Sequence, residues 1–304
     1  MNIQQLQYVI AVDDKRHIQK AAEACFVTPG TLSIMLKKLE EELDLVIFDR
    51  TKYPIVPTER GKIVIQNARD ILSAVDKMHY DVKYAFEEKS LSGELKIGII
   101  PTLAPYLLHH FLPAILEKYP GITIQLKELR TFQVKDYLRK DMIDVGIIAL
   151  QNESKEFKTR SLFHEKLLIY APDTDAIPDK KYILSDEIDV NKLWLLEEEH
   201  CLRSQVMDLC SLKEKMADQD QLKFEAGSIE TLLNLVEMMK GITIIPELAT
   251  IDFSTIRKNG VRQFADPVPS REIGLITYRP FVKENLIDIL ENEIKNAMQH
   301  VITS

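Results

Sequence analysis

From residue 95 onward the chain alternates between short apolar runs and segments of helical period. The runs 95–100, 122–129 and 144–150 have the composition and length of strands, and 105–116 and 132–139 have helical spacing between them. Strands that alternate with helices imply parallel sheets, which bind ligands at the carboxyl ends of their strands. The pattern predicts an α/β domain with a ligand site at those ends.

The alternation continues toward the C-terminus. Residues 166–171, 192–196 and 241–246 are strand-like, and Ser228 is the expected N-cap of a helix over 229–240. Short runs of this kind extend the α/β prediction over the rest of the chain.

The first 60 residues have a different pattern. A short helical segment, 18–24, is followed by Thr28, which suits an N-cap, and Pro29, which suits the first helical position. Apolar residues then recur at three and four residues, as on one face of an amphipathic helix: Leu32, Met35, Leu36, Leu39 and Leu43. Two short helices joined by a tight turn predict a helix-turn-helix.

The other face of this second helix has the side chains that DNA binding requires. Small residues let a helix enter the major groove, and lysines contact phosphates. The expected DNA contacts are Thr28, Gly30, Thr31, Ser33, Lys37 and Lys38. A helical hairpin with a solvated lysine face is the alternative.

Residues 44–61 contain two short β-rich runs broken by Lys52 and Pro54. This pattern predicts a wing, with Arg50 and Lys52 available to the backbone of a DNA duplex. Thr58 is then expected to cap a further helix.

That helix carries apolar residues at alternating spacings of four and three, the a/d repeat of a coiled coil. The repeat predicts a dimerisation helix, whereas a helix that packs on its own core usually has a wider apolar face. The residues concerned are Val64, Ala68, Ile71, Val75, Met78 and Val82, and residues 87–94 are expected to end the helix and form a hinge.

Two of the three cysteines lie between residues 195 and 211. His200 precedes Cys201 and Arg203 follows it, and nearby cations favour the reactive thiolate, whereas Cys210 has no such neighbours. If the segment were one helix, the nine-residue spacing would put the cysteines on opposite faces, roughly 13 Å apart along the axis. A disulfide needs Cα atoms within about 7 Å, so bonding would require a second conformation. The alternative is a pair of small buried hydrophobic residues.

Length and composition limit the classes of protein to which the chain can belong. The chain has 304 residues, which predicts two or more units, and its net charge of −8 argues against a uniformly basic nucleic-acid binder. No apolar run reaches the roughly 18 residues of a membrane span, and the N-terminus lacks the features of a signal peptide, so a cytoplasmic location is expected. In a reducing compartment a disulfide is usually transient, catalytic or sensory.

The assembled order resembles the LysR-type transcriptional regulators over essentially the whole chain. The likeness is carried by A-A-E-A-C-F-V-T-P-G-T-L-S-I-M-L at 21–36, F-D-R-T at 48–51, T-E-R-G at 58–61 and G-I-T-I-I-P at 241–246. Within that family, G-I-I-P-T-L-A-P-Y-L-L at 98–108, the segment 195–210 and I-E-T-L-L-N-L-V at 229–236 resemble its hydrogen-peroxide sensors.

The resemblance implies a fold and a set of boundaries. The fold is an N-terminal winged helix-turn-helix with a long linker helix, then a two-lobed, periplasmic-binding-protein-like α/β effector domain. The expected DNA-binding domain is 1–60, the linker helix and hinge 61–93, and the regulatory domain 94–304. Its lobes are about 94–165 with 269–304, and about 166–268.

The resemblance also implies roles for particular residues. Cys201 matches the peroxide-reactive cysteine and Cys210 its resolving partner. Residues that match the lining of the peroxide pocket are Thr102, Thr131, His200, Arg203 and Arg271. Expected partners are promoter DNA, hydrogen peroxide, RNA polymerase, cellular thiol reductants and further copies of the chain as a dimer or tetramer; no membrane partner, cofactor or metal is expected.

One departure from the family concerns DNA reading. Where the recognition helix usually opens with Ser-Gln-Pro, this chain has Thr28-Pro29-Gly30, and residues 34–36 are apolar where the family is often polar.

Two other functions are compatible with parts of the sequence. A LysR-type regulator with inert cysteines would respond to a small metabolite in the same cleft. A thiol peroxidase or Cys-His hydrolase would use His200, Cys201 and Arg203 for turnover but would leave the first 90 residues unexplained. His109, His110 and His164 lack the spacing of a zinc site.

Overall fold

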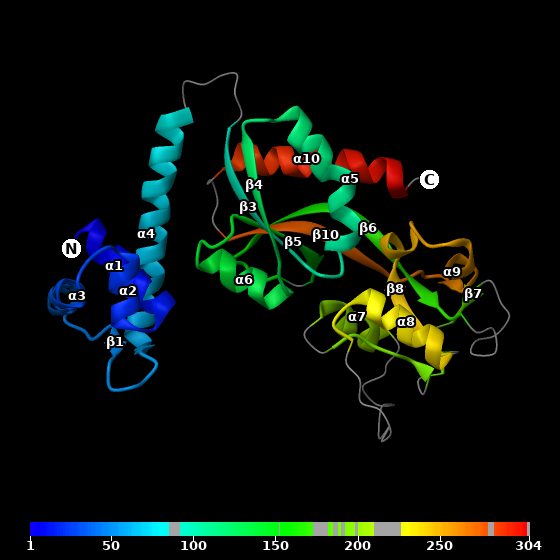
Figure 1. Cartoon of the computed structure of the whole chain (residues 1–304), viewed down its shortest axis with the longest axis horizontal. Helices are drawn as coiled ribbons and strands as arrows, with labels where there is room; N and C mark the ends of the chain where they lie inside the picture. Colours follow the sequence, from blue (N-terminus) through cyan, green and yellow to red (C-terminus); the bar gives the residue numbers. More distant parts are fainter. Residues whose placement is uncertain are drawn as a thin grey trace. The chain divides into compact units, whose positions relative to one another are not determined.

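The computed structural model describes residues 1–84, 92–151, 153–172, 182–184, 188–189, 192–197, 200–209, 226–278 and 283–302. The chain divides into two compact units, Met1–Glu88 and Lys89–Ser304, and Figure 1 labels most of the elements of each. Among the helices of the described residues, none has the length and apolar character needed to cross a membrane.

The N-terminal unit is a helix-turn-helix with a wing, as predicted. Its elements in order are α1 (Ile3–Lys15), α2 (Ile18–Ala24), α3 (Pro29–Leu43), β1 (Phe48–Asp49), β2 (Val56–Pro57) and α4 (Glu59–Tyr84). β1 and β2 pair antiparallel and form the wing. The two strands occupy the two β-rich runs that the sequence indicates.

The start of α3 is fixed by its cap. Thr28 Oγ1 accepts a hydrogen bond from the Thr31 amide at 3.2 Å, and Pro29 is the first helical residue. The predicted apolar face packs against α1 and α2, and its fully buried residues are Leu32, Leu36 and Leu39.

The start of α4 lies directly against the strand that leads into the wing. A side chain at Gly61 would place its Cβ 2.0 Å from the Ile47 carbonyl oxygen, so only glycine fits there. Farther along α4, the buried Arg69 guanidinium donates to Asp13 at 2.9 Å and to Asp14 at 2.5 Å, which ties α4 to α1. The first turns of α4 are therefore part of the N-terminal core.

This packing corrects one part of the predicted dimerisation face. Ala68 is only 1% exposed and belongs to the N-terminal core, and Val64 packs against the same core, so Ala68 cannot face a second helix. Val75 is half-buried, and the residues of the repeat that remain exposed are Ile71, Met78 and Val82.

The second unit is built on one mixed sheet of eight strands. The sheet order is β4-β3-β5-β10-β6-β9-β7, and β8 pairs with β6. The strands are β3 (Gly93–Ile99), β4 (Ile122–Glu128), β5 (Val145–Leu150), β6 (Lys158–Tyr170), β7 (Tyr182–Ile183), β8 (Thr243–Pro246), β9 (Val261–Phe264) and β10 (Ser270–Thr277).

The expectation of parallel strands is correct for only part of this sheet. β3 runs parallel to β4 and to β5, but β10 is antiparallel to both β5 and β6, and β8 is antiparallel to β6. β10 returns from the far end of the chain and inserts between β5 and β6, a long-range pairing that local patterns do not encode.

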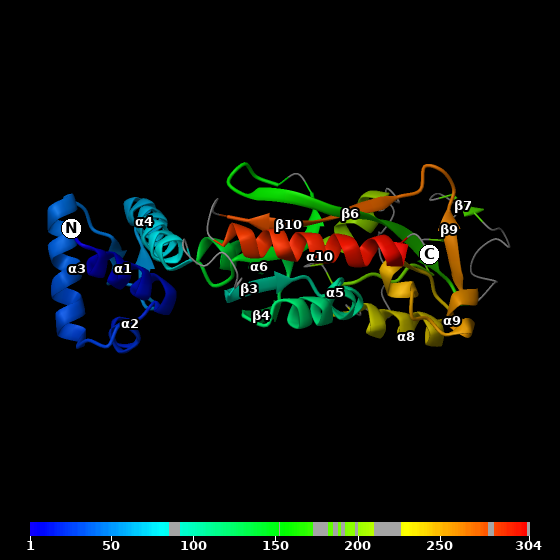
Figure 2. The same cartoon turned by 90° about the horizontal axis from the view of Figure 1, so that it is seen from above.

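Helices pack against the sheet in both halves of the second unit. They are α5 (Ala104–Lys118), α6 (Thr131–Arg139), α7 (Cys201–Leu209), α8 (Ile229–Met239), the 3-10 helix η5 (Glu247–Thr250), α9 (Thr255–Asn259) and α10 (Glu284–Ile302). α10 packs beside α5 and against β6, as Figure 2 shows from above.

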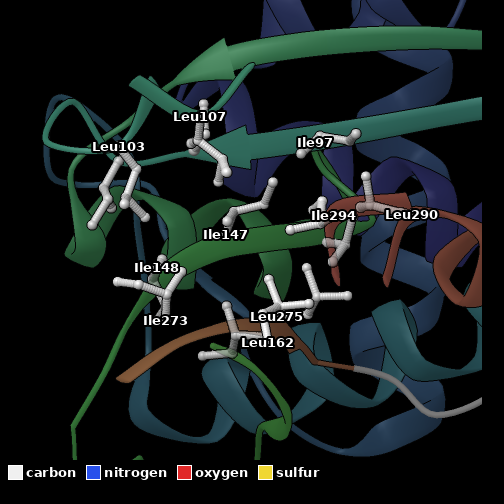
Figure 3. Close-up of a cluster of buried hydrophobic side chains, with 14 of the residues drawn as sticks. Ile97, Leu103, Leu107, Ile147, Ile148, Leu162, Ile273, Leu275, Leu290 and Ile294 are labelled. Atoms are coloured by element: carbon white, nitrogen blue, oxygen red, sulfur yellow. The ribbon is translucent and has the colours of Figure 1, made fainter. Parts of the chain in front are cut away.

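Two hydrophobic cores underlie the two lobes. The first surrounds Ile97 and Ile147, with Leu290 and Ile294 of α10 against them (Figure 3). The second is built from β6, β8 and α8, around residues such as Leu232 and Ile245. The 13-residue strand β6 contributes Leu162 to the first core and Leu167 to the second, so it joins the lobes.

Candidate functional site

Cys201 is the first residue of α7, and a tight turn places it there. The His200 amide donates to the Glu197 carbonyl at 3.1 Å, and the Arg203 amide donates to the His200 carbonyl at 3.0 Å. Just before this turn, Leu196 forms a parallel bridge with Ala226. Cys201 therefore sits at the end of an extended segment and at the N-terminus of a helix, where the helix dipole favours an anion.

A pocket of about 250 Å³ opens beside this cysteine. The N-terminus of α6 contributes to it from the first lobe and the N-terminus of α7 from the second. Its lining residues are Thr131, Phe132, Lys135, Gln151, His200, Cys201 and Ser204. Three residues that the sequence assigns to the site, Thr131, His200 and Cys201, are thus brought together.

The Thr131 hydroxyl is a free hydrogen-bonding group at this pocket. Its Oγ1 is buried and has no hydrogen-bond partner among the described residues. A buried hydroxyl without a partner costs free energy, so a small polar molecule that bonds to it recovers that cost. The pocket is chemically suited to such a molecule.

His200 is buried beside Cys201, with 4% of its surface exposed. Its Nε2 lies 3.3 Å from Glu197 Oε1, but the geometry is not that of a hydrogen bond. Burial lowers the pKa of His200, although the Glu197 carboxylate opposes this shift. A lowered pKa favours the neutral imidazole, which counts against the interpretation of this residue as a cation beside the thiol. Glu197 is itself paired with Arg130.

Arg203 does not line the pocket. Its Nη1 donates to the Leu196 carbonyl at 2.8 Å, across the turn that precedes Cys201. Its guanidinium thus holds the backbone that positions the cysteine.

Thr102 and Arg271 form a separate, buried network. Arg271 Nε donates to Glu165 Oε2 at 2.8 Å, and its Nη1 and Nη2 donate to the hydroxyl and carbonyl oxygens of Thr102 at 3.1 and 3.2 Å. The Leu248 amide donates to the other Glu165 oxygen at 2.9 Å. None of these residues lines the pocket.

The sequence reasoning missed Glu165 and four lining residues. Glu165 lies just before the predicted strand-like run 166–171, and it is the register partner of Arg271 across β6 and β10, a pairing that sequence order alone does not reveal. The missed lining residues have a local signal, because Ser204 lies one helical turn after Cys201 and Lys135 one turn after Thr131. The four are Phe132, Lys135, Gln151 and Ser204.

The predicted helix over the two cysteines is described in part. α7 covers Cys201–Leu209, and Cys210 lies outside the described residues. Cys201 is a half-buried free cysteine. Cys25, in the helix-turn-helix, is also half-buried and free, and burial raises the pKa of its thiol.

The predicted DNA contacts lie mostly on the surface. Along α3 and its cap, Ser33 is half-buried and the exposed residues are Thr28, Gly30, Thr31, Lys37 and Lys38. In the wing, Arg50 Nη2 donates to Glu40 at 2.9 Å, and Lys52 is exposed with its Nζ 3.9 Å from Asp49. Arg50 is therefore engaged within the unit.

Within the described part of the chain, no cluster of three or more His, Cys, Asp or Glu side chains is arranged to hold a metal ion. The rings of His109 and His110, neighbours on α5, are tilted by 43° to each other with centroids 4.0 Å apart.

A winged helix-turn-helix followed by a long helix and a two-lobed α/β unit defines a bacterial regulatory helix-turn-helix protein with an effector domain. The chain belongs to the LysR family. Residues 3–62 match the model of the bacterial regulatory helix-turn-helix protein of the lysR family, and residues 88–293 match that of the LysR substrate binding domain.

Individual relatives are similar over nearly the full length. The chain is 36% identical to the DNA-binding transcriptional dual regulator OxyR of Escherichia coli K12, over 92% of this chain and 90% of that protein. A solved structure of a full-length OxyR variant from Pseudomonas aeruginosa is 29% identical, with a TM-score of 0.77 over 97% of this chain and 95% of that one. An H2O2-bound OxyR mutant from Corynebacterium glutamicum is 26% identical, with a TM-score of 0.63 over 99% and 94%.

Proposed function

We propose that this protein is a DNA-binding transcriptional regulator that senses hydrogen peroxide through Cys201. The observation that carries the proposal is the position of this cysteine, at the start of α7 and in the wall of a small pocket with Thr131 and His200. Relatives named OxyR support it, and one solved structure among them is described as H2O2-bound.

The reaction at Cys201 consumes one peroxide. The thiolate sulfur attacks one peroxide oxygen, an S–O bond forms, the O–O bond breaks, and the departing hydroxide takes a proton to become water. The sulfenic acid on Cys201 is then attacked by the Cys210 sulfur, which forms an S–S bond and releases a second water. Two thiols are oxidised and one peroxide is reduced.

The pocket residues bind and orient the oxidant in this scheme. The Thr131 hydroxyl, which has no hydrogen-bond partner among the described residues, bonds to a peroxide oxygen, and His200 lines the pocket from which the hydroxide departs. The two assigned arginines do not contact the oxidant; each holds a backbone segment. Arg203 holds the turn before Cys201, and Arg271 holds the loop of Thr102 after β3.

Oxidation acts on transcription through two arrangements of the segment 196–211. Joining Cys201 to Cys210 favours an arrangement in which this segment is rebuilt, and contacts between effector units pass the change to the DNA-binding heads. Self-association, as a dimer through the exposed residues of α4 and as a tetramer, supplies those contacts. RNA polymerase responds to the changed arrangement of the DNA-binding heads, and cellular thiol reductants restore the dithiol. Each chain is oxidised once per reset, so the protein is a sensor and not an enzyme.

The direct test is the effect of peroxide on transcription from a bound promoter. Cys201→Ser should keep DNA binding and lose the peroxide response, because serine cannot form the sulfenic acid. Cys25→Ser is the matched control, since Cys25 is also half-buried and free, and it should respond like the wild type. A normal peroxide response in the Cys201→Ser protein would overturn the role of Cys201, and a wild-type protein without any peroxide response would favour a LysR-type regulator that binds a small metabolite.

A further inference from the structure

The exposed face of α3 presents a large apolar side chain at its centre. Ile34 is 58% exposed, although the helix has a well-packed apolar face on its other side. At about 100° per residue, Ile34 lies roughly 160° from Leu32 around the helix axis, so it points away from the N-terminal core.

The neighbours of Ile34 on this face are the residues expected to contact DNA. Gly30, Thr31, Lys37 and Lys38 fall with Ile34 in an arc of about 120° around the helix. Within that arc Ile34 lies between the two lysines, so cationic side chains flank an apolar one. Lys37 also approaches Glu41 at 3.6 Å, but both side chains remain largely exposed. A basic surface with an apolar centre complements a major groove, which has phosphates at its rims and base edges on its floor.

Gly30 supplies a second observation on the same face. A Cβ built there would meet only the Thr28 hydroxyl, at 3.9 Å, so packing within the unit does not require glycine. Glycine in a helix interior is destabilising by roughly 0.5–1 kcal/mol relative to alanine, and at the second helical position it still brings no stabilising contact. An exposed glycine that the fold does not need is consistent with a backbone that must come close to another molecule.

We propose that Ile34 reads the 5-methyl group of thymine in the major groove. This inference rests on the proposed DNA-binding function, and it specifies which feature of the DNA bases the protein recognises. Ile34 has no hydrogen-bonding group, so it cannot read the donors and acceptors of the base edges. The thymine methyl is the apolar feature of the major groove, and apolar side chains contact it directly. Ile34 therefore favours A·T pairs in each half-site through methyl contact, while Lys37 and Lys38 bind phosphates.

The experiment removes that methyl and nothing else. The full-length protein is first used to select duplexes from a randomised pool, and a selected duplex is then made again with deoxyuridine in place of each thymine of the half-site. Wild-type protein should bind the deoxyuridine duplex about fourfold more weakly for each contacted methyl, as measured by fluorescence anisotropy.

Two variants assign the effect to Ile34. Ile34→Ala should bind the thymine and deoxyuridine duplexes equally, because the side chain that meets the methyl is gone. Ile63→Ala is the matched control, since Ile63 is 63% exposed in the same unit but lies on α4, and it should keep the wild-type preference for thymine.

The outcomes separate the two proposals. Equal binding of both duplexes by the wild type, or an unchanged preference in Ile34→Ala, would overturn the methyl contact and leave the proposed function intact. If the wild type selects no duplex from the pool, the proposed function fails, and this inference fails with it.

Discussion

At the scale of single residues, Glu165 and Arg271 form a fully buried ion pair in the second unit. Both side chains are 0% exposed, and their charges are compensated mainly by each other, with Thr102 and Leu248 completing the hydrogen bonds. A buried ion pair adds little net stability when intact, but the loss of one partner leaves an uncompensated charge.

Glu165→Gln should therefore lower the free energy of unfolding by about 3 kcal/mol, because the Arg271 guanidinium loses its counter-charge. Urea unfolding of the variant against the wild type measures this change. Glu94→Gln is the control, since Glu94 pairs with Lys96 at the surface at 3.5 Å and its loss should cost less than about 1 kcal/mol. Equal effects of the two substitutions would contradict the account of the buried pair.

His200 gives a prediction about pH. Burial lowers the pKa of His200 below its ordinary value of 6.5, so the unfolded chain binds this proton more readily than the folded chain. The stabilising contribution of the neutral imidazole is fully present above pH 6.5 and decreases as the pH falls below that value.

His200→Asn should reduce the fall in Tm between about pH 7.5 and about pH 5.5, because asparagine takes up no proton. Thermal unfolding across that range is the measurement. His79→Asn, at an exposed position on α4, should leave the pH dependence unchanged. A slope in His200→Asn as steep as that of the wild type would show that another group controls the acid sensitivity.

At the scale of elements, local signals predicted well those structures that local forces determine. The Thr28 cap and the leucine spacing located α3, and the broken β-rich run located the wing. The insertion of β10 between β5 and β6 depends on residues more than 100 positions apart, so the sheet could not be ordered from sequence.

The candidate site followed the same division. The strand end before Thr131 follows from local pattern, and Thr131 lines the pocket with Cys201. The protonation state of His200 depends on burial by the folded chain, and the Glu165 partner of Arg271 depends on strand register. Neither is visible in a linear sequence.

A substitution at Gly30 should change the stability of the N-terminal unit and its affinity for DNA in opposite directions. Gly30→Ala should raise the free energy of unfolding of the N-terminal unit by about 0.5–1 kcal/mol, because alanine favours the helix and its Cβ has open space. The same methyl should weaken DNA binding by holding the helix away from the groove. Chemical unfolding and anisotropy on a selected duplex measure the two effects, and a variant that is more stable and binds equally well would contradict the close approach.

At the scale of the whole molecule, the proposed function links a thiol in one unit to DNA binding by the other. The second unit supplies the pocket and Cys201, and the N-terminal unit supplies α3 and the exposed residues of α4. Coupling of this kind requires an event in the effector domain that favours one of two arrangements. In the proposed function that event is the formation of a covalent bond between Cys201 and Cys210.

Mass spectrometry of the full-length protein after mild peroxide treatment tests this claim most directly. The account predicts a cross-linked pair of peptides that contain Cys201 and Cys210, lighter than the two free peptides by two hydrogens and separated again by a thiol reductant, while Cys25 stays a free thiol. Peroxide-treated protein in which Cys201 and Cys210 both remain free thiols would contradict it.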